Sequence, residues 1–262
     1  MVKRVLSALI GGPILLVLTW LGGWYLTLLI VVLALLAFRE FISIGQKAGL
    51  ATQSKLMGLF CVLCLATFLF HRTEWLLSVG FIGFIFTFGN YAIRYPLISL
   101  ADATYGFLAF FYPLGLLTNL YYLRELPHGA SWCFFVFLLV WVTDSGAFFV
   151  GSAIGKRKLA PNVSPNKSIE GAVGGVLAAC CFGFVFWLIA KEGSLPAILF
   201  LSILTSIVAQ IGDLFESALK RTAGVKDSGN VIPGHGGILD RFDSFLFAIP
   251  IVYLSLILGL VG

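Results

Sequence analysis

Polar residues that include aspartates occur at helical spacing at two places in the last third of the chain. Asp213 and Ser217 are four residues apart, and Asp240 and Asp243 are three apart, so the members of each pair share one face of a helix. Two helices that meet across the intervening loop would bring these carboxylates together. Carboxylate oxygens suit a hard divalent cation. The spacing therefore indicates a site for such a cation at the helix ends.

Cations and glycines lie in the loop between these acids. Lys220 and Arg221 follow Asp213 closely, and the segment Pro233-Gly-His-Gly-Gly237 has a permissive backbone that lets main-chain N–H groups approach a phosphate. Nucleotidyl and phosphoryl transfer need both metal-binding acids and phosphate-binding cations, because the transition state spreads negative charge over phosphate oxygens. The alternative is a solvated loop of ion pairs, such as Glu216 with Lys220.

A second polar loop, residues 151–170, carries Lys156, Arg157 and Lys158 in a row and Lys167 close behind. Its glycines and prolines set tight turns, which favours an anion-binding surface. It is not a P-loop, because the spacing between its glycines is one residue short and Arg157 stands where Ser or Thr would bind magnesium. The alternatives are a loop whose cations only set the topology, or a patch for anionic lipid.

Asp144 lies inside an apolar run, about six residues from its end, or roughly 9 Å along a helix. A carboxylate at such a depth costs about 2.5–3.5 kcal/mol on insertion scales, so it is expected to be functional or paired with a cation. We predict that Asp144 faces a polar cavity that opens to the cytosol.

The composition identifies the setting in which these residues work. The chain has 262 residues, of which 60% are hydrophobic and 11% are charged, and its net charge is +5. Its mean hydropathy is +1.02. A soluble chain has about 25% charged residues. The composition therefore excludes a soluble enzyme, a disordered chain and a nucleic-acid-binding domain, and it indicates a polytopic membrane protein.

The apolar runs predict an all-α fold, a polytopic integral membrane protein of about nine transmembrane helices with a cytosol-facing polar cavity. We expect a single transmembrane domain over residues 1–262. A mostly apolar helical half, 1–130, would precede a catalytic half, 131–262, with cytosolic loops at 151–170 and 216–241. The runs lie at about residues 5–22, 24–42, 56–71, 75–94, 102–122, 131–150, 171–190, 195–215 and 242–261.

The lysines and arginines predict the orientation. With the N-terminus in the cytosol and nine spans, fourteen of the seventeen Lys and Arg residues fall on the cytosolic side. Only Arg72, Arg124 and Lys191 fall on the other side. Because cytosolic loops carry the excess of positive charge, we expect the N-terminus inside and the C-terminus outside.

Several motifs resemble a known family. They are Ser217-Ala-Leu-Lys-Arg, Lys226-Asp227 and His235-Gly-Gly-Ile-Leu-Asp240-Arg-Phe-Asp243, with Asp144-Ser-Gly-Ala, Gly155-Lys, Leu159-Ala-Pro and Ser164-Pro-Asn-Lys-Ser-Ile-Glu-Gly171 upstream. Together they resemble the signature of the phosphatidate cytidylyltransferase (CDP-diacylglycerol synthase) family. One departure is Ser168-Ile169, where the family often has Thr-Trp.

The resemblance implies a reaction in which CTP and phosphatidate give CDP-diacylglycerol and pyrophosphate with Mg²⁺. It implies that Asp213 and Asp240 are the metal ligands, and that Asp144, Asp227 and Asp243 hold a second, monovalent cation or support the ligands. The phosphate-binding cations would be Lys167, Lys220, Arg221, Lys226 and Arg241. The other substrate-binding residues would be Lys156, Ser217, Gly236 and Gly237, together with His235, which contacts a phosphate or shapes the turn.

The expected partners follow from this reaction. CTP would enter from the cytosol and phosphatidate sideways from the lipid bilayer, with no nucleic acid involved and with a homodimer permitted. The expected location is the bacterial cytoplasmic (inner) membrane, with the active site facing the cytosol. Two other readings are a CDP-alcohol phosphotransferase, whose longer Asp-rich signature is missing here, and a cation transporter, whose acids would lie near the bilayer midplane.

Overall fold

The computed structural model describes residues 2–70, 72–231 and 236–261. The chain divides into two compact units. The first unit contains Met1–Thr118 and Leu219–Arg241, and the second contains Asn119–Ala218 and Phe242–Gly262. His235, one of the predicted substrate-binding residues, lies outside the described residues.

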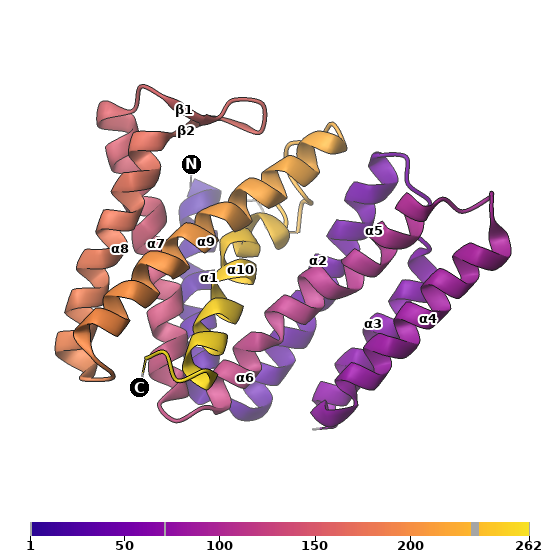
Figure 1. Cartoon of the computed structure of the whole chain (residues 1–262), viewed down its shortest axis with the longest axis horizontal. Helices are drawn as coiled ribbons and strands as arrows, with labels where there is room; N and C mark the ends of the chain where they lie inside the picture. The colour runs from indigo at the N-terminus through magenta and orange to yellow at the C-terminus, as the bar shows by residue number, and fades with distance from the viewer. Residues whose placement is uncertain (1, 71, 232–235, 262) are drawn as a thin grey trace. The chain divides into compact units, whose positions relative to one another are not determined.

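The first unit consists of helices that follow one another through short loops (Figure 1). Its elements are α1 (Val2–Leu21), α2 (Gly23–Lys47), α3 (Ser54–Leu69), the 3₁₀ turn η1 (Thr73–Trp75), α4 (Leu76–Arg94), α5 (Leu100–Phe110) and the π turn η2 (Phe111–Gly115). Helix α5 begins with a capping box, in which Ser99 and Asp102 each accept a backbone N–H from the other. The π turn contains Pro113, which has no N–H to donate to a regular helical ladder.

Aromatic side chains connect α2 with α5 in this unit. The rings of Phe41 and Tyr105 stack with centroids 4.6 Å apart, and the Tyr105 hydroxyl donates to the Phe41 carbonyl at 2.8 Å. Asp102 also accepts the backbone N–H of Ala51 at 2.7 Å, which holds the loop after α2 against the start of α5. These contacts fix α2, which carries Glu40, against α5 within the unit.

The second unit combines helices with a small hairpin. Its elements are α6 (Asn119–Glu125), α7 (Gly129–Ile154), β1 (Lys158–Ala160), β2 (Ser164–Ser168), α8 (Ile169–Ala190), most of α9 (Leu195–Thr222) and most of α10 (Leu239–Ile257). Strands β1 and β2 pair antiparallel, with Lys158 opposite Ser168 and Ala160 opposite Ser164. The described residues fold mainly into helices, and this hairpin lies in the predicted loop 151–170, where the sequence analysis expected no strands.

Small residues let α7 and α8 lie close together. A Cβ atom on Gly146 would lie 2.6 Å from the Cβ of Ala178, and one on Gly175 would lie 2.9 Å from the carbonyl oxygen of Thr143. Close approach through glycine is a common mode of helix packing in membranes. This packing connects the two helices that lead into and out of the hairpin.

Eight of the nine predicted apolar runs each overlap one α-helix, and the fifth, 102–122, covers α5, η2 and the start of α6. The prediction of a polytopic helical membrane protein is confirmed. Within the described residues, six helices are long and apolar enough to cross a membrane. They are Gly23–Lys47, Leu76–Arg94, Leu100–Glu125, Gly129–Ile154, Ile169–Ala190 and Leu195–Thr222. Leu9–Leu21 and Ser54–Leu69 are shorter apolar helices.

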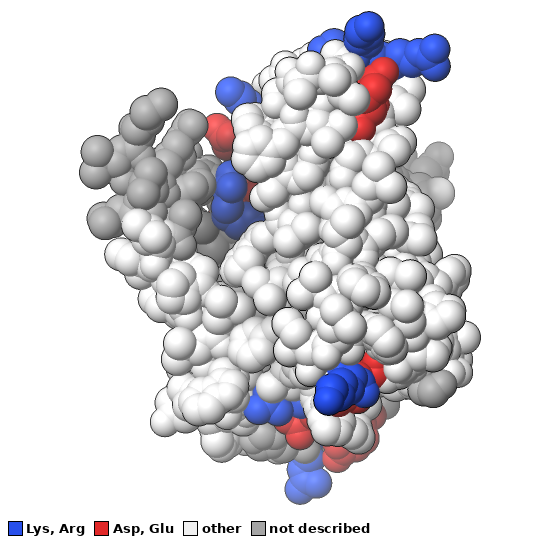
Figure 2. Space-filling model, turned by 90° about the vertical axis from the view of Figure 1, so that its left-hand side faces the viewer, with Lys and Arg blue, Asp and Glu red and all other residues white. Residues whose placement is uncertain are grey.

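Helix α8 illustrates the surface that such a helix offers to lipid. Its side chains Val173, Leu177, Leu188 and Ile189 are all more than half exposed. Figure 2 shows a broad uncharged band on this side of the protein, with most Lys, Arg, Asp and Glu side chains towards its two ends. This is the distribution expected of a surface in contact with the hydrocarbon core of a bilayer.

Candidate active site

Helices α7, α9 and α10 bring four acidic residues together in the second unit. Asp213 and Glu216 lie on α9, Asp144 lies on α7, and all three repel the carboxylate of Asp243 on α10 electrostatically. A Cβ atom on Gly212 would lie 2.7 Å from the Asp243 carbonyl oxygen, so glycine at this position allows α9 and α10 to approach closely beside the acids. The predicted residues Asp144, Asp213 and Asp243 therefore belong to one acidic cluster.

Glu216 belongs to the same cluster but was not among the predicted site residues. Its side chain is completely buried, which is rare for glutamate outside a functional or paired setting. The available sequence signal was its position three residues after Asp213, on the same face of the helix. Its position favours a role for the Glu216 carboxylate in the same site as the predicted metal ligand Asp213.

Asp213 contacts a lysine that the hairpin supplies. The Lys167 Nζ atom lies 2.5 Å from Asp213 Oδ2, and both side chains are 29% exposed. Ser217, one helical turn further along α9, donates its hydroxyl to Asp213 Oδ1 at 3.3 Å. The predicted residues Lys167, Asp213 and Ser217 are thus in direct contact, and strand β2 places the lysine.

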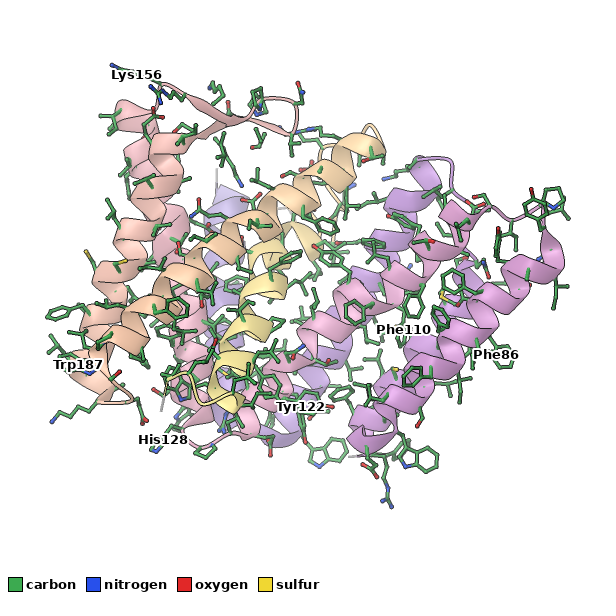
Figure 3. All side chains as sticks on the ribbon, viewed as in Figure 1. Phe86, Phe110, Tyr122, His128, Lys156 and Trp187 are labelled. Carbon is green, nitrogen blue, oxygen red and sulfur yellow. The ribbon has the colours of Figure 1, made fainter. Side chains whose placement is uncertain are left out.

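Hydrogen bonds to the start of α8 hold the hairpin in position. Ser168 caps α8 by accepting the Gly171 N–H at 3.1 Å. Glu170 accepts the backbone N–H groups of Lys156 and Arg157 at 3.1 and 3.2 Å. The Lys156 side chain is exposed, and Figure 3 shows it at the hairpin end of the second unit, opposite His128. The hairpin therefore presents its first cations outward and directs Lys167 towards α9.

Asp240 has a separate set of partners in the first unit. Its Oδ1 atom lies 2.5 Å from Lys220 Nζ, and both side chains are largely buried, with 6% and 12% exposed. Its Oδ2 atom accepts the backbone N–H groups of Ser228 at 2.9 Å and of Gly237 at 2.8 Å. Burial acts to raise the pKa of Asp240, but the Lys220 ammonium and these N–H groups outweigh it, so the pKa lies below its usual range.

The glycines before Asp240 shape this turn. Gly236 has a φ of +83°, a region that favours glycine, and a Cβ on it would lie 2.5 Å from Asp240 Oδ2. The sequence predicts that the N–H groups of this segment face a phosphate. In the structure the Gly237 N–H donates to Asp240.

The remaining predicted residues lie at the surface. Lys226, Asp227 and Arg241 are exposed, and the Arg221 guanidinium donates to the Val225 carbonyl at 3.3 Å. Asp144 is also exposed. It lies ten residues before the end of α7, or about 15 Å along the helix, because α7 continues to Ile154, beyond the end of the apolar run. The predicted distance of roughly 9 Å refers to the end of the apolar run, and the helix continues beyond that point.

Glu40 is a second residue that the sequence analysis missed. It lies on α2, inside the predicted run 24–42, and is 5% exposed. Its carboxylate accepts the backbone N–H groups of Ile238 and Leu239, at the start of α10. A charge within an apolar run was the signal that could have identified it.

The donor set fits a divalent cation in charge and in chemistry. The side chains of Asp144, Asp213 and Glu216 outnumber the single ammonium of Lys167 in the second unit, and carboxylate oxygens are preferred ligands of Mg²⁺. Among the residues that the structure describes, no three Asp, Glu, His or Cys side chains form a preformed metal site. Lysine ammonium groups contact the predicted ligands Asp213 and Asp240, one in each unit, and their sharing of one Mg²⁺ stays a prediction.

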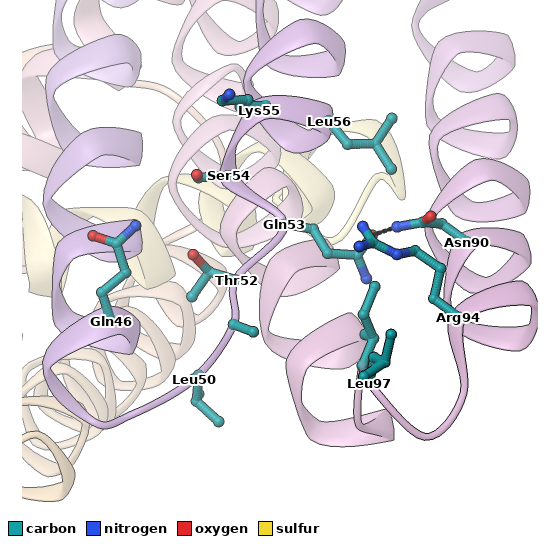
Figure 4. Close-up of a pocket in the computed structure, with 12 residues that line it drawn as sticks. Gln46, Leu50, Thr52, Gln53, Ser54, Lys55, Leu56, Asn90, Arg94 and Leu97 are labelled. Atoms are coloured by element: carbon teal, nitrogen blue, oxygen red, sulfur yellow. Dashed lines mark hydrogen bonds between the residues drawn. The ribbon is translucent and has the colours of Figure 1, made fainter.

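A cavity of about 510 Å³ lies elsewhere in the first unit (Figure 4). It is formed by the loop after α2, the start of α3 and the end of α4, with Gln46, Gln53, Lys55, Asn90 and Arg94 among its lining residues. The Asn90 amide donates to Gln53 Oε1 at 2.8 Å. None of the predicted site residues lines this cavity.

Comparison with known proteins places the whole chain. The Cytidylyltransferase family matches residues 2–258. The chain belongs to this family. It is 36% identical over 261 residues to the phosphatidate cytidylyltransferase of Staphylococcus epidermidis strain RP62A, covering 97% of this chain and 98% of the relative.

Two further relatives carry the same name. The phosphatidate cytidylyltransferase of Staphylococcus aureus strain COL is 32% identical over 269 residues, covering 97% of this chain and 98% of the relative. That of Bacillus subtilis strain 168 is 51% identical over 133 residues, which are 50% of this chain and 49% of the relative. The resemblance inferred from the motifs, and with it the class of membrane-bound nucleotidyltransferase, is confirmed.

Proposed function

We propose that this chain transfers the cytidylyl group of CTP to phosphatidate, giving CDP-diacylglycerol and pyrophosphate. The observation that carries the proposal is the family match over residues 2–258. Relatives that align over almost their whole length are named phosphatidate cytidylyltransferases. The acid–lysine pairs Asp213–Lys167 and Asp240–Lys220 supply side chains of the kind that this chemistry needs.

In the proposed reaction, a phosphate oxygen of phosphatidate attacks the α-phosphorus of CTP. A new bond forms between this oxygen and the α-phosphorus, while the bond from the α-phosphorus to the oxygen that bridges to the β-phosphate breaks. Pyrophosphate leaves with that electron pair, in line with the attacking oxygen. The nucleophile is already an anion, so no side chain has to remove a proton.

The side chains then act by positioning and by neutralising charge. Lys167 and Lys220 each contact an aspartate, and their ammonium groups are suited to bind phosphate oxygens. Asp213 and Asp240 would hold Mg²⁺, which when bound neutralises phosphate oxygens of CTP. Asp144 and the neighbouring Glu216 would keep the surroundings negative and so favour a cation, with Asp243 beside them as a supporting side chain.

The proposed setting is the cytoplasmic membrane of a bacterium, with the N-terminus and the active site on the cytosolic side. The chain is a multi-pass membrane protein and its relatives are bacterial. The positive charge of the hairpin, with Lys156, Arg157 and Lys158, supports this orientation. A homodimer stays a prediction.

The test is an assay of purified protein in mixed micelles that contain phosphatidate, Mg²⁺ and CTP labelled at the α-phosphate. We expect label in the lipid phase, with one pyrophosphate released for each labelled lipid. Omission of phosphatidate should abolish both signals. Labelling without phosphatidate, or release of CMP from added CDP-diacylglycerol in place of pyrophosphate from CTP, would contradict the proposal.

A further inference from the structure

Glu40 of α2 is buried against a segment almost two hundred positions away in the sequence. Its Oε1 atom accepts the Ile238 N–H at 2.9 Å, and its Oε2 atom accepts the Leu239 N–H, also at 2.9 Å. These N–H groups lie at the start of α10, where a helix has no internal acceptors for them. Glu40 therefore caps α10 from a different helix, with one carboxylate oxygen for each N–H.

Glycines allow the segment to approach Glu40 so closely. A Cβ atom on Gly229 would lie 2.6 Å from Glu40 Oε1. A Cβ atom on Gly237 would collide with both Glu40 Oε2 and Ser228 Oγ. The segment that contains the predicted Gly236 and Gly237 therefore fits around the Glu40 carboxylate.

The same segment also holds Asp240. The Ser228 hydroxyl oxygen lies 2.9 Å from Glu40 Oε2 and 2.9 Å from Asp240 Oδ2, so its single proton can be donated to either carboxylate. The backbone N–H groups of Ser228 and Gly237 donate to Asp240, whereas those of Ile238 and Leu239 donate to Glu40. Any movement of the segment away from Glu40 would therefore remove donors from Asp240.

Within the described part of the chain, the Lys220 ammonium contacts the carboxylate of Asp240 and not that of Glu40. Asp240 pairs with Lys220. Of the ion pairs found among the described residues, none includes Glu40, and its hydrogen-bond donors are two backbone N–H groups and the Ser228 hydroxyl. The N–H groups at the start of α10 and the Ser228 hydroxyl stabilise the Glu40 carboxylate. Glu40 therefore holds the backbone and does not compete with Asp240 for Lys220.

We propose that Glu40 is a positioning residue for the transfer reaction: it fixes residues 228–229 and 237–239 so that Asp240 and Lys220 keep the arrangement that the reaction uses. This inference rests on the proposed function. Glu40 acts through the backbone and does not itself touch substrate. Because it directs two oxygens at two N–H donors, its carboxylate matters more than its volume.

The choice of variants separates positioning from packing. Glu40→Gln keeps the volume but replaces one acceptor oxygen by an amide NH₂ that faces an N–H donor. Glu40→Asp keeps both oxygens but is one methylene shorter. If Glu40 only fills space, Gln should function better than Asp. If Glu40 positions the segment, Asp should function better than Gln. Glu74→Gln, at a carboxylate that is 57% exposed, is the matched control.

The experiment measures kinetics and amide hydrogen exchange on the same purified proteins, scored per folded protein by gel filtration. We expect Glu40→Gln to lower kcat about tenfold or more while the KM values for CTP and phosphatidate change about twofold or less, since positioning acts mainly on the transition state. Glu40→Asp should recover part of kcat. Peptides that span 225–241 should exchange faster in Glu40→Gln, and Glu74→Gln should match the wild type in both measurements.

Three results would overturn the inference. They are a Glu40→Gln enzyme with wild-type kcat, unchanged exchange in residues 225–241, and an activity loss accounted for entirely by loss of folded protein. Hydrogen exchange does not depend on turnover, so it reports on the segment even if the wild-type protein makes no CDP-diacylglycerol. In that case the proposed function fails, and with it the positioning role of Glu40 in the reaction, whereas slow exchange that depends on Glu40 would still establish the contact.

Discussion

At the residue scale, two aspartates each contact a lysine in different surroundings. The Lys167–Asp213 pair is partly exposed, and exposed pairs of this kind contribute little to stability. The Lys220–Asp240 pair is largely buried and has additional N–H donors. The first pair is therefore free to exchange its lysine for substrate or metal at low cost, whereas the second is also a structural element of its unit.

Removal of the charge from either aspartate should abolish turnover without preventing membrane insertion. We expect Asp213→Asn and Asp240→Asn each to lower kcat by about 10²-fold or more, since each removes a charge from the proposed site. The measurement is lipid labelling by purified protein at equal folded concentration, with Glu74→Gln as control. Wild-type activity in either variant would remove that residue from the metal assignment.

The depressed pKa of Asp240 predicts a pH dependence of stability. A carboxyl group whose pKa is lower in the folded state stabilises the fold above its unfolded pKa of about 3.9, and this stabilisation is lost as the pH falls through the lower, folded pKa. At pH 7 we expect Asp240→Asn to destabilise the protein by about 3 kcal/mol, because it removes the carboxylate charge that the largely buried Lys220 ammonium contacts.

Thermal unfolding in detergent between pH 7 and pH 3 checks this prediction. The difference in Tm between the wild type and Asp240→Asn should stay constant from pH 7 to about pH 4 and narrow only below that. A difference that widens as the pH falls from 7 to 5 would show that the pKa of Asp240 is raised, and a difference that stays constant down to pH 3 would show that it is not depressed.

At the element scale, the helices were predictable from sequence because hydrophobicity is a local property. The apolar runs became helical, the fifth in three pieces (α5, η2 and α6), and the last became α10, whose start carries Asp240 and Asp243. The hairpin was not predictable in this way, since its strands are short and polar. Its fixed position depends on Ser168 and on the contact of Glu170 with backbone N–H groups fourteen positions earlier in the chain.

Local sequence patterns also could not predict which residues the site side chains contact. Lys167 and Asp213 are far apart in the sequence, and Glu40 contacts residues 188 to 199 positions away. Spacing could group Asp240 with Asp243 on one helical face, but it could not show that Asp240 binds Lys220 or that Gly237 donates to it. These contacts depend on how the helices pack.

The close packing of α7 and α8 makes a further prediction at this scale. Gly175→Ala would bring a Cβ atom 2.9 Å from the Thr143 carbonyl oxygen, so we expect it to destabilise the protein by roughly 1–3 kcal/mol. Gly58→Ala on α3 is the control, since nothing lies within 4 Å of its added Cβ. It should be neutral or stabilise the helix by up to about 1 kcal/mol. Equal Tm values for the two variants would contradict this account of the packing.

The exposed cations of the loop 151–170 are proposed to bind CTP, so removal of the Lys156 side chain should weaken nucleotide binding. Lys156→Ala removes only an exposed side chain, because the backbone N–H that donates to Glu170 remains. The loss of one charge contact worth about 1 kcal/mol should raise the KM for CTP about fivefold with little change in kcat. Lys191→Ala, at the other end of α8, is the control. A KM equal to that of the wild type would mean that the hairpin cations only set the topology.

At the scale of the whole molecule, the boundaries between the two compact units lie inside helices. Helix α9 passes from the second unit to the first between Ala218 and Leu219, and α10 returns between Arg241 and Phe242. The segment Leu219–Arg241 therefore places Lys220 and Asp240 in the first unit, where Glu40 accepts the N–H groups of Ile238 and Leu239, while Asp213 and Asp243 belong to the second.

The orientation is the remaining property of the whole chain that the lysines predict. The hairpin and Lys191 lie at opposite ends of α8, whose 22 residues span about 33 Å, enough to cross a hydrocarbon core of about 30 Å. With Cys180→Ser and Cys181→Ser as background, we expect a membrane-impermeant maleimide to label Lys191→Cys in intact cells. Lys158→Cys should be labelled only after the cytoplasmic membrane is permeabilised. The reverse pattern would place the hairpin, and the lysines proposed to bind CTP, on the side of the membrane where the nucleotide is absent.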